Sequence, residues 1–378
     1  MKKILKNIGK AAIFHCMFPL MYKWYSRKPL RDNVVLFIEI RYVELSDNFT
    51  LLYEEFQKRE GFTVDTSFLG NSVFSYRDYI KACMSMIPKL AAARYVFVDE
   101  SSNVLAALPI RKETAIIQTW HGCGAFKRFG YGGVDELKER YYNDYYFTTV
   151  SSPEVIDIYA KSMGQDKSRV LPIGVSRTDV FFDKEYISSC KKEIRERYGI
   201  GDGKTVILYA PTFRGNVQEA QSPELLDIRK MYEGLGNGYV ILYKGHPAVK
   251  AMPDVLKEYA HFFINACDEK IERLMCASDM CITDYSSLVF EYALLDKPMY
   301  FYAYDYKEYV TERGFYYSYE EFVPGGIYYN EEELVQGISG DKEVSLEKIK
   351  KFREKFMSSC DGNSTSRIIS KIIDTHLT

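Results

Sequence analysis

Alternation of short apolar runs with helix-like segments is the feature that most restricts how this chain can fold. In the first half, runs typical of buried strands occur at 33–40, 94–100, 114–120 and 145–150. Segments typical of helices lie near 47–60, 75–92 and 152–162. After about residue 172 the alternation starts again, with strand-like runs at 205–212, 239–247, 262–265, 279–284 and 298–303. Strands separated by helices form parallel sheets covered on both faces, so the sequence predicts an α/β protein with two Rossmann-like domains and a cleft between them.

The length of the chain supports this division, because 378 residues exceed what one hydrophobic core usually holds. We predict a basic amphipathic segment at 1–31, an N-terminal domain at 32–175 and a C-terminal domain at 176–358. A last segment, 359–378, contains a predicted helix at about 363–376 that could cross back to the first domain.

Composition and missing motifs exclude several classes of protein. The net charge of −2 argues against a nucleic-acid binder that acts through overall charge. The eight cysteines form no Cys-x-x-Cys pair, so we predict reduced, mostly buried thiols and no zinc site. The chain has no Gly-x-Gly-x-x-Gly fingerprint, P-loop or Gly-x-Ser-x-Gly elbow. No Asp-x-Asp-like cluster stands out either, so we predict neither a metal site nor a fixed cofactor.

The first 31 residues form a basic segment on a chain that is acidic elsewhere. They contain eight Lys and Arg and no Asp or Glu, which leaves 42 basic against 52 acidic residues in the remainder. The apolar stretch at 11–22 is too short to span a bilayer, and no signal-peptidase cleavage site follows it. We therefore favour an interfacial helix on an anionic membrane, with Tyr22 and Trp24 at headgroup depth. A helix that packs on its own domain with its lysines in water is the alternative.

Residues 118–130, QTWHGCGAFKRFG, place a histidine at the end of a predicted strand. Gly122 and Gly124 follow His121 and allow the loop to wrap closely around a ligand. Lys127 and Arg128 add positive charge. A histidine in such a loop is well placed to act as a general base, and a structural histidine beside a turn is the alternative.

Two strand ends in the second half also carry candidate ligand-binding side chains. LYAPTFRG, at 208–215, ends in Arg214, whose guanidinium suits bidentate phosphate binding unless it is simply a surface residue. YKGHP, at 243–247, delivers Lys244 and His246. Each half of the chain thus has one histidine at a strand end. The remaining three, His15, His261 and His376, lack this context and are interpreted as structural or surface residues.

The segment ITDYSSLVFEYALLDKP, at 282–298, leads from a predicted strand into a helix. Asp284, Ser286 and Ser287 lie at the turn, where hydroxyl side chains and exposed backbone N–H groups can bind an anion such as a diphosphate. Glu291 lies one helical turn after Ser287, where a carboxylate can accept hydrogen bonds from ribose hydroxyls. The alternative is an ordinary capped helix with Glu291 in solvent.

In this order and spacing the motifs resemble one known family. TWHG (119–122), LYAPTFR (208–214), KGHP (244–247) and TDYSSLVFEYALLDKPMYFYAYD (283–305) are similar to the CDP-glycerol:poly(glycerophosphate) glycerophosphotransferases of teichoic acid synthesis. GVSRTD (174–179) and ERGFYY (312–317) add to the likeness, which covers roughly 90–320. The resemblance implies the GT-B fold, with the donor on the C-terminal domain and the acceptor toward the N-terminal one.

The resemblance also implies a reaction and roles for residues. These enzymes transfer glycerol phosphate, or in some members ribitol phosphate, from a CDP-activated donor to a hydroxyl on a lipid-linked carrier and release CMP. His121 would be the base for the acceptor hydroxyl, and His246 would stabilise charge on the donor diphosphate. The predicted donor-binding residues are Arg214, Lys244, Thr283, Asp284, Ser286, Ser287 and Glu291. The predicted acceptor-side loop contains Trp120, Gly122, Gly124 and Lys127.

On this basis we expect glycerol phosphate transfer to a polyprenyl-diphosphate-linked saccharide by a cytoplasmic enzyme, peripheral on the inner face of the cell membrane. The expected donor substrate is CDP-glycerol or CDP-ribitol. Where the family often has Thr-Pro after TWHG, this chain has Cys123 and Gly124, which leaves the acceptor undefined. A single catalytic unit slightly favours a priming enzyme or short-chain transferase over a long-chain polymerase.

Two other interpretations are consistent with the sequence. A GT-B glycosyltransferase or epimerase that uses a nucleotide sugar would share the donor helix and Glu291. A membrane-bound scaffold that has lost activity would retain the fold, but the intact His121, His246 and serine pair argue against it. The sequence does not distinguish glycerol from ribitol, primase from polymerase, or one oligomeric state from another.

Overall fold

The computed structural model describes residues 9–133, 142–215, 220–246, 249, 257–312, 314–340 and 346–376. The chain divides into two compact units, each described here by itself. The first unit comprises Met1–Cys123, Phe129–Asp179 and Ser359–Thr378, and the second comprises Gly124–Arg128 and Val180–Ser358. The chain therefore passes between the units four times, and its last helix belongs to the first unit.

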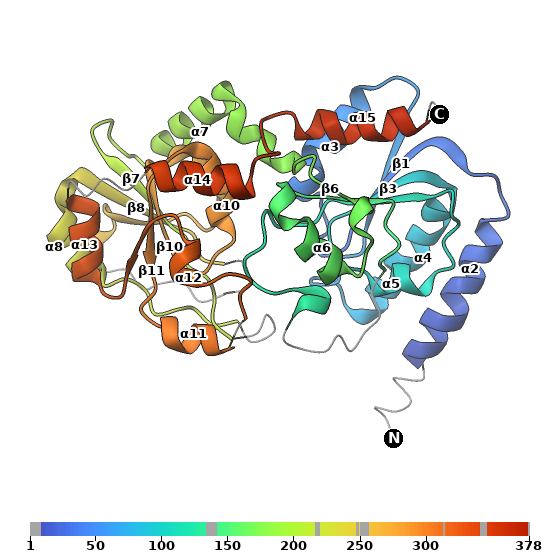
Figure 1. Cartoon of the computed structure of the whole chain (residues 1–378), viewed down its shortest axis with the longest axis horizontal. Helices are drawn as coiled ribbons and strands as arrows, with labels where there is room; N and C mark the ends of the chain where they lie inside the picture. The colour runs from blue at the N-terminus through green and yellow to red at the C-terminus, as the bar shows by residue number, and fades with distance from the viewer. Residues whose placement is uncertain are drawn as a thin grey trace. The chain divides into compact units, whose positions relative to one another are not determined.

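The first unit contains a parallel sheet of six strands in the order β2-β1-β3-β4-β5-β6. Figure 1 labels β1, β3 and β6 of this sheet. The strands are β1 (Arg31–Glu39), β2 (Thr63–Phe68), β3 (Ala93–Val98), β4 (Ala115–Gln118), β5 (Phe147–Thr149) and β6 (Val170–Leu171). The main helices are α2 (Phe18–Tyr25), α3 (Asp47–Lys58), α4 (Tyr76–Ala92), α5 (Asn103–Ala107), α6 (Ile156–Met163) and α15 (Ser364–His376). The predicted strands and helices of this half are confirmed, and β2 and β6 are additions that sequence analysis missed.

The C-terminal helix α15 completes the core of the first unit. Ile368, Ile369 and Ile372 are fully buried with side chains of β1, β3, β4 and the neighbouring α3. The N-terminus of α15 is capped by Asp179, whose carboxylate accepts hydrogen bonds from two backbone N–H groups, at 3.0 and 2.8 Å. A capping carboxylate satisfies donors that the helix itself leaves unpaired.

The helix near the N-terminus uses one face to pack on the first unit. It runs through a π-helical turn, Ile13–Met17, into α2, and Phe14, Phe18 and Tyr22 are buried against α4 and α5. These residues are four apart and therefore lie on one side of the helix. The prediction that Tyr22 lies at headgroup depth is therefore wrong, because its side chain is buried in the first unit. Most of the lysines predicted to lie on the membrane, at positions 2, 3 and 6, fall outside the described residues. No helix among the described residues is long and apolar enough to cross a membrane.

The second unit repeats the architecture with a parallel sheet in the order β12-β11-β10-β7-β8-β9. Its strands are β7 (Thr205–Tyr209), β8 (Tyr239–Tyr243), β9 (Phe263–Asn265), β10 (Met280–Thr283), β11 (Met299–Tyr302) and β12 (Gly326–Tyr328). Its helices are α7 (Lys184–Arg197), α8 (Ile228–Leu235), α9 (Ile271–Ala277), α10 (Leu288–Tyr292), α11 (Tyr306–Glu312), α12 (Tyr319–Phe322), α13 (Glu331–Ser339) and α14 (Leu346–Phe356).

Each sheet has a point where the direction of strand addition reverses. In the first unit β2 and β3 lie on opposite sides of β1, and in the second unit β8 and β10 lie on opposite sides of β7. Connections that leave such neighbouring strands in opposite directions open a crevice at the carboxyl ends of the strands, where α/β proteins bind ligands. The residues that follow β1, β3, β7 and β10 are therefore the first place to look for a site.

Candidate functional site

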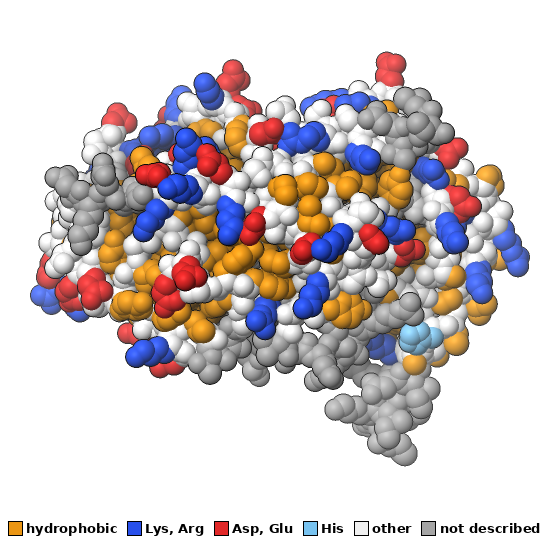
Figure 2. Space-filling view, viewed as in Figure 1, with side chains coloured by type: hydrophobic (Ala, Val, Ile, Leu, Met, Phe, Trp, Pro, Cys, Tyr) orange, Lys and Arg blue, Asp and Glu red, His pale blue; other side chains and the backbone are white. Residues whose placement is uncertain are grey.

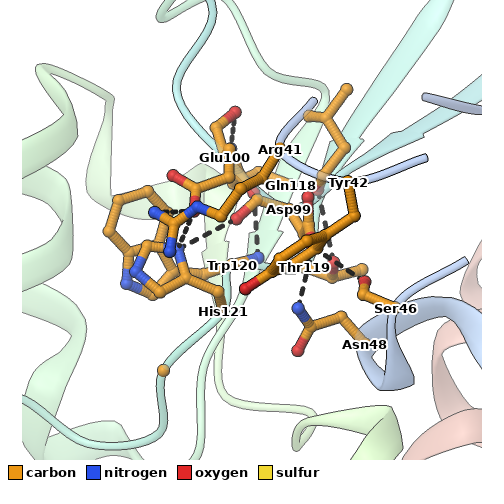
Figure 3. A network of polar contacts seen from close by, with 12 residues as sticks. Arg41, Tyr42, Ser46, Asn48, Asp99, Glu100, Gln118, Thr119, Trp120 and His121 are labelled. Atoms are coloured by element: carbon orange, nitrogen blue, oxygen red, sulfur yellow. Dashed lines mark hydrogen bonds and ion pairs between the residues drawn. The ribbon is translucent and has the colours of Figure 1, made fainter. Parts of the chain in front are cut away.

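His121 follows β4 and is held by a strained turn at the carboxyl edge of the first sheet (Figure 3). The preceding residue, Trp120, has a φ of 56°, which is unfavourable for a residue with a side chain. The buried Gln118 supports this turn, because its Oε1 accepts the N–H of Trp120 at 2.8 Å. The Trp120 ring packs beside His121 and Phe129, with centroid distances of 4.3 and 5.2 Å.

Two acceptors from the end of β3 face Nδ1 of His121. The backbone carbonyl oxygen of Asp99 and Oε1 of Glu100 each lie 3.2 Å from it. The same Glu100 oxygen is 2.5 Å from Nη2 of Arg41, which follows β1. The switch-point strands β1 and β3 thus bring a guanidinium and a carboxylate to the candidate base (Figure 3).

Burial shifts the protonation of both groups in this contact. Burial, together with the charges of Asp99 and Glu39, raises the pKa of Glu100 to about 7 against the opposing effect of Arg41. Burial, together with the charge of Arg41, lowers the pKa of His121 to about 4. The His121 side chain is still 38% exposed. The imidazole is therefore neutral at neutral pH and open to solvent on part of its surface.

A second arginine reaches the same loop from the GVSRTD motif. Nη1 of Arg177 donates to the carbonyl oxygen of His121 at 2.6 Å and to Oδ1 of Asn48 at 2.5 Å. Asn48 in turn donates to Oδ2 of the buried Asp99 at 2.7 Å. Burial and the charge of Glu39 raise the pKa of Asp99 to about 6. These contacts fix the backbone on both sides of the imidazole.

Arg214, the predicted phosphate ligand after β7, is held by two carboxylates of the second unit. It lies 2.5 Å from Asp305, through Nε, and 3.0 Å from Asp284, through Nη2. Its guanidinium also lies over the rings of Tyr285 and Tyr309, at 5.2 and 5.0 Å from the centroids. Although burial opposes the charge, the two carboxylates raise the pKa of Arg214 above its usual value. Direct phosphate binding by this side chain would require it to exchange these partners.

The end of β10 and the turn after it contain four more of the predicted donor-binding residues. Thr283 and Asp284 are buried; Oγ1 of Thr283 donates to a carbonyl of the β7 loop, and Asp284 accepts the N–H of Thr212. Ser286 is half-buried and accepts the N–H of Leu288 at 3.2 Å, while Ser287 is exposed. Ser287 occupies the N-cap position of α10, but its side chain caps no backbone N–H group. Ser286, one residue earlier, makes the capping contact instead.

Three further predicted residues lie elsewhere around the second sheet. Lys244 donates to the carbonyl oxygens of Cys267 and Glu269, both at 2.5 Å, and burial lowers its pKa. His246 is half-buried with its ring 4.6 Å from that of Phe213. Glu291 is half-buried on α10, one turn after Ser287. Lys244 thus anchors a loop, while His246 and Glu291 keep partly exposed surfaces.

The predicted acceptor-side loop is divided between the units. Trp120 and Gly122 belong to the first unit, whereas Gly124–Arg128 packs with the second. Lys127 pairs with Phe315 in an antiparallel bridge, and the Phe126 ring stacks between Phe315 and Phe322 with centroids 4.4 Å apart. Gly124 has a φ of +58°, and a Cβ there would meet the Phe290 ring at 2.1 Å. Glycine at 124 therefore serves close packing.

Sequence analysis missed four charged residues that lie beside the predicted ones at strand ends: Arg41, Asp99, Glu100 and Asp305. Asp99 and Glu100 end a run interpreted only as a strand, and Asp305 ends the motif that contains the serine pair. Their signal was a charged side chain directly after an apolar run. Each becomes informative only when the strand order places it beside another strand end.

Two sheets of six parallel strands, with the candidate side chains at their strand ends, define an α/β protein of the GT-B class. Within it, the chain belongs to the CDP-Glycerol:Poly(glycerophosphate) glycerophosphotransferase family, whose sequence model matches residues 20–374. The resemblance inferred from the motifs and the predicted fold class are both confirmed.

Curated relatives include enzymes for two polyols. The chain is 33% identical to the teichoic acid ribitol-phosphate primase of Bacillus spizizenii, over 97% of each protein. It is 34% identical to the teichoic acid poly(ribitol-phosphate) polymerase of the same organism, covering 94% of this chain but 59% of the polymerase. It is 32% identical to the teichoic acid glycerol-phosphate primase of Bacillus subtilis, over 74% of this chain and 73% of that protein.

Solved structures share the fold. The wall teichoic acid polymerase TagF aligns over 100% of this chain and 97% of that structure, with a TM-score of 0.77 and 25% identity. A UDP-GlcNAc 2-epimerase from Neisseria meningitidis aligns over 90% of this chain and 100% of that structure, with a TM-score of 0.57 and 15% identity. The second likeness concerns the fold alone.

Proposed function

We propose that the chain transfers polyol phosphate from a CDP-activated donor to a hydroxyl of a lipid-linked carrier and releases CMP. The observation that carries the proposal is the environment of His121. Its Nδ1 faces a backbone carbonyl oxygen, which can only accept a hydrogen bond, so Nδ1 carries the proton and Nε2 carries the lone pair. A neutral imidazole in this state can accept a proton from an acceptor hydroxyl.

The proposed step balances as a phosphoryl transfer. The acceptor O–H bond breaks, its proton moves to Nε2 of His121, and the oxygen attacks the phosphorus that carries the polyol. The bond from this phosphorus to the bridging oxygen breaks, and CMP leaves with the electron pair. Because charge develops on that oxygen, His246 and the serine pair Ser286 and Ser287 of the second unit are proposed to stabilise the diphosphate. Glu291 is proposed to bind the cytidine ribose.

Arg214, Lys244, Thr283 and Asp284 are proposed to act on the donor indirectly. Each is already engaged within the second unit, by carboxylates or by backbone groups of neighbouring strand ends. These contacts hold the loops after β7, β8 and β10 together. The family suggests CDP-glycerol as the donor, and no fixed cofactor enters the proposal.

The identity of the polyol has two candidates. Glycerol phosphate is the prediction from sequence. Ribitol phosphate is favoured by one observation: four relatives that match 90% or more of this chain at 33–34% identity are named as ribitol-phosphate enzymes. We therefore propose CDP-ribitol as the second donor to test. The UDP-sugar alternative is supported only by a likeness of fold.

We further propose that the N-terminal helix holds the enzyme on the anionic inner face of the cell membrane. The helix presents Met17, Leu20 and Trp24, which are 36%, 65% and 57% exposed, away from its packed face. Exposed Lys23 and Arg27 lie beside them, and Figure 2 shows hydrophobic and basic side chains together in this region. An apolar stripe flanked by basic residues is typical of helices at a membrane interface.

The proposal is tested by measuring CMP release with CDP-glycerol and, separately, CDP-ribitol, in the presence of a short lipid-linked disaccharide. His121→Ala is expected to lower transfer by at least about a hundredfold, because general-base catalysis contributes on this scale. Donor binding, measured by calorimetry, is expected to change by less than about threefold. A large loss of donor affinity in this variant would contradict the role of His121 as acceptor base.

A further inference from the structure

The environment of His121 contains one group that the reaction scheme does not yet use. Glu100 has a side chain that is only 16% exposed, and it is placed between the imidazole and Arg41. Its Oε1 contacts both groups, at 3.2 and 2.5 Å. A carboxylate that served only to pair with Arg41 would not need to face the imidazole as well.

The backbone carbonyl and the carboxylate have different consequences for the ring. The carbonyl oxygen of Asp99 determines the tautomer, because Nδ1 must donate to it. It carries no full charge, however, and it cannot compensate the positive charge that appears when Nε2 accepts a proton. Glu100 can do so when it is ionised, as the buried carboxylate does in a carboxylate–histidine pair.

The charges around the imidazole show why this compensation matters. Arg41, after β1, and Arg177, after β6, both disfavour the protonated ring. Asp99, at the end of β3, and Glu39, on β1, are the other buried carboxyl groups that act on Glu100. Asp99 has its Oδ2 engaged by Asn48 and Ser46, whereas the Glu100 carboxylate contacts the ring itself.

We propose that Glu100 is a positioning residue for His121: it holds the imidazole through Nδ1–H and offsets the positive charge formed when Nε2 takes the acceptor's proton. Arg41 orients the carboxylate for this role. The inference rests on the proposed function for its kinetic consequence, but the contact between Glu100 and His121 can be tested without any substrate.

The kinetic test uses Glu100→Gln, which keeps the shape of the side chain and removes the charge. We expect kcat to fall about a hundredfold, at the lower end of the range for acid–base catalysis because the Asp99 carbonyl still determines the tautomer. KM for the CDP-polyol should stay within about twofold. Glu100→Asp retains the charge and should recover about tenfold of the loss. Glu113→Gln makes the same change at an exposed site before β4 and should have wild-type kinetics.

The pH profile separates this role from a structural one. Glu100 loses its proton as pH rises through about 7, so kcat/KM of the wild-type enzyme should rise through the same range. In Glu100→Gln this inflection should be absent, because the amide does not titrate. A variant that is merely less stable would lose activity at every pH and keep the inflection.

The substrate-free test is an NMR titration of the His121 ring, identified by comparison with His121→Gln. In the wild-type protein the ring signals should shift near pH 7, as the adjoining carboxyl ionises, and in Glu100→Gln they should not. This result would support the contact between Glu100 and His121 even if no CDP-polyol released CMP. Absence of CMP release would contradict the proposed reaction alone. Wild-type kcat and pH profile in Glu100→Gln, or ring signals that still shift near pH 7, would overturn the proposal.

Discussion

Replacement of Arg214 by methionine is expected to destabilise the second unit severely, even without substrate. The guanidinium is the positive partner of Asp284 and Asp305, which are only 3% and 12% exposed. Methionine has a similar length but no charge, so both carboxylates would be left in a poorly solvated environment with less compensation. The contacts of the guanidinium with the Tyr285 and Tyr309 rings would be lost as well.

The size of this effect follows from the burial of the ion pairs. Removal of one partner of a buried ion pair costs about 3–5 kcal/mol, since it leaves an uncompensated charge. In a unit of this size each kcal/mol lowers the melting temperature by about 2–4 °C. Arg214→Met should therefore lower the melting temperature of the second unit by about 6–20 °C. The additional substitution Asp305→Asn removes one of the two uncompensated carboxylate charges and should restore part of the lost melting temperature.

Differential scanning calorimetry provides the assay, with Arg229→Met as the matched control. Arg229 makes an ion pair with Glu233 at 2.9 Å, but both side chains are more than half exposed and solvent screens the pair, so the change should leave the melting temperature nearly unchanged. The reasoning would be refuted if Arg214→Met melted like the control while affinity for a CDP-polyol fell more than tenfold. Arg214 would then be a donor ligand, as its position in the sequence suggests.

Two other variants test separate parts of the account. Gly124→Ala should destabilise the protein by about 2–5 kcal/mol, because it combines a positive φ with overlap of the Phe290 ring, and a calorimetric melting temperature within 2 °C of wild type would contradict this. Leu20→Glu combined with Trp24→Glu should weaken binding to anionic vesicles at least tenfold in a sedimentation assay. Transfer to a water-soluble acceptor should be unchanged, since the packed face of the helix is retained; undiminished vesicle binding would place the membrane contact elsewhere.

Much of the fold was predictable because parallel strands that are buried on both faces leave continuous apolar runs. β1, β3, β4 and the central strands of the second sheet have this signature. Besides β2, the sequence analysis did not predict β6 and β12, which contain two and three residues, too few to show any periodicity. β2 reads TVDTSF, whose polar residues reflect its place at the edge of the sheet.

The candidate site was predictable only in part. His121, His246 and Ser286 each follow an apolar run and belong to a recognisable motif, so their position along the chain was informative. Glu100 and Arg41 gain their meaning from the adjacency of β1 and β3, which linear spacing does not encode. In the same way, Asp284 and Asp305 become partners of Arg214 only because the fold brings them together.

The packing of Gly124–Arg128 with the second unit also could not be predicted from the sequence. These residues lie between two strands of the first sheet along the chain. Their contacts, however, are with Phe290, Phe315 and Phe322, which come more than 150 residues later. Stacking between residues that are so far apart in the sequence leaves no local pattern. Gly124 itself was identified as a candidate, but its role could be interpreted in several ways.

The central claim is tested most directly by the mass of the lipid-linked product after incubation with CDP-ribitol or CDP-glycerol. The account predicts that the acceptor gains one or more polyol-phosphate units from at least one of these donors, in step with CMP release, and that His121→Ala yields no such product. An unchanged acceptor with both donors, from protein that is folded and binds a UDP-sugar, would contradict the account and identify a nucleotide-sugar enzyme on the same fold.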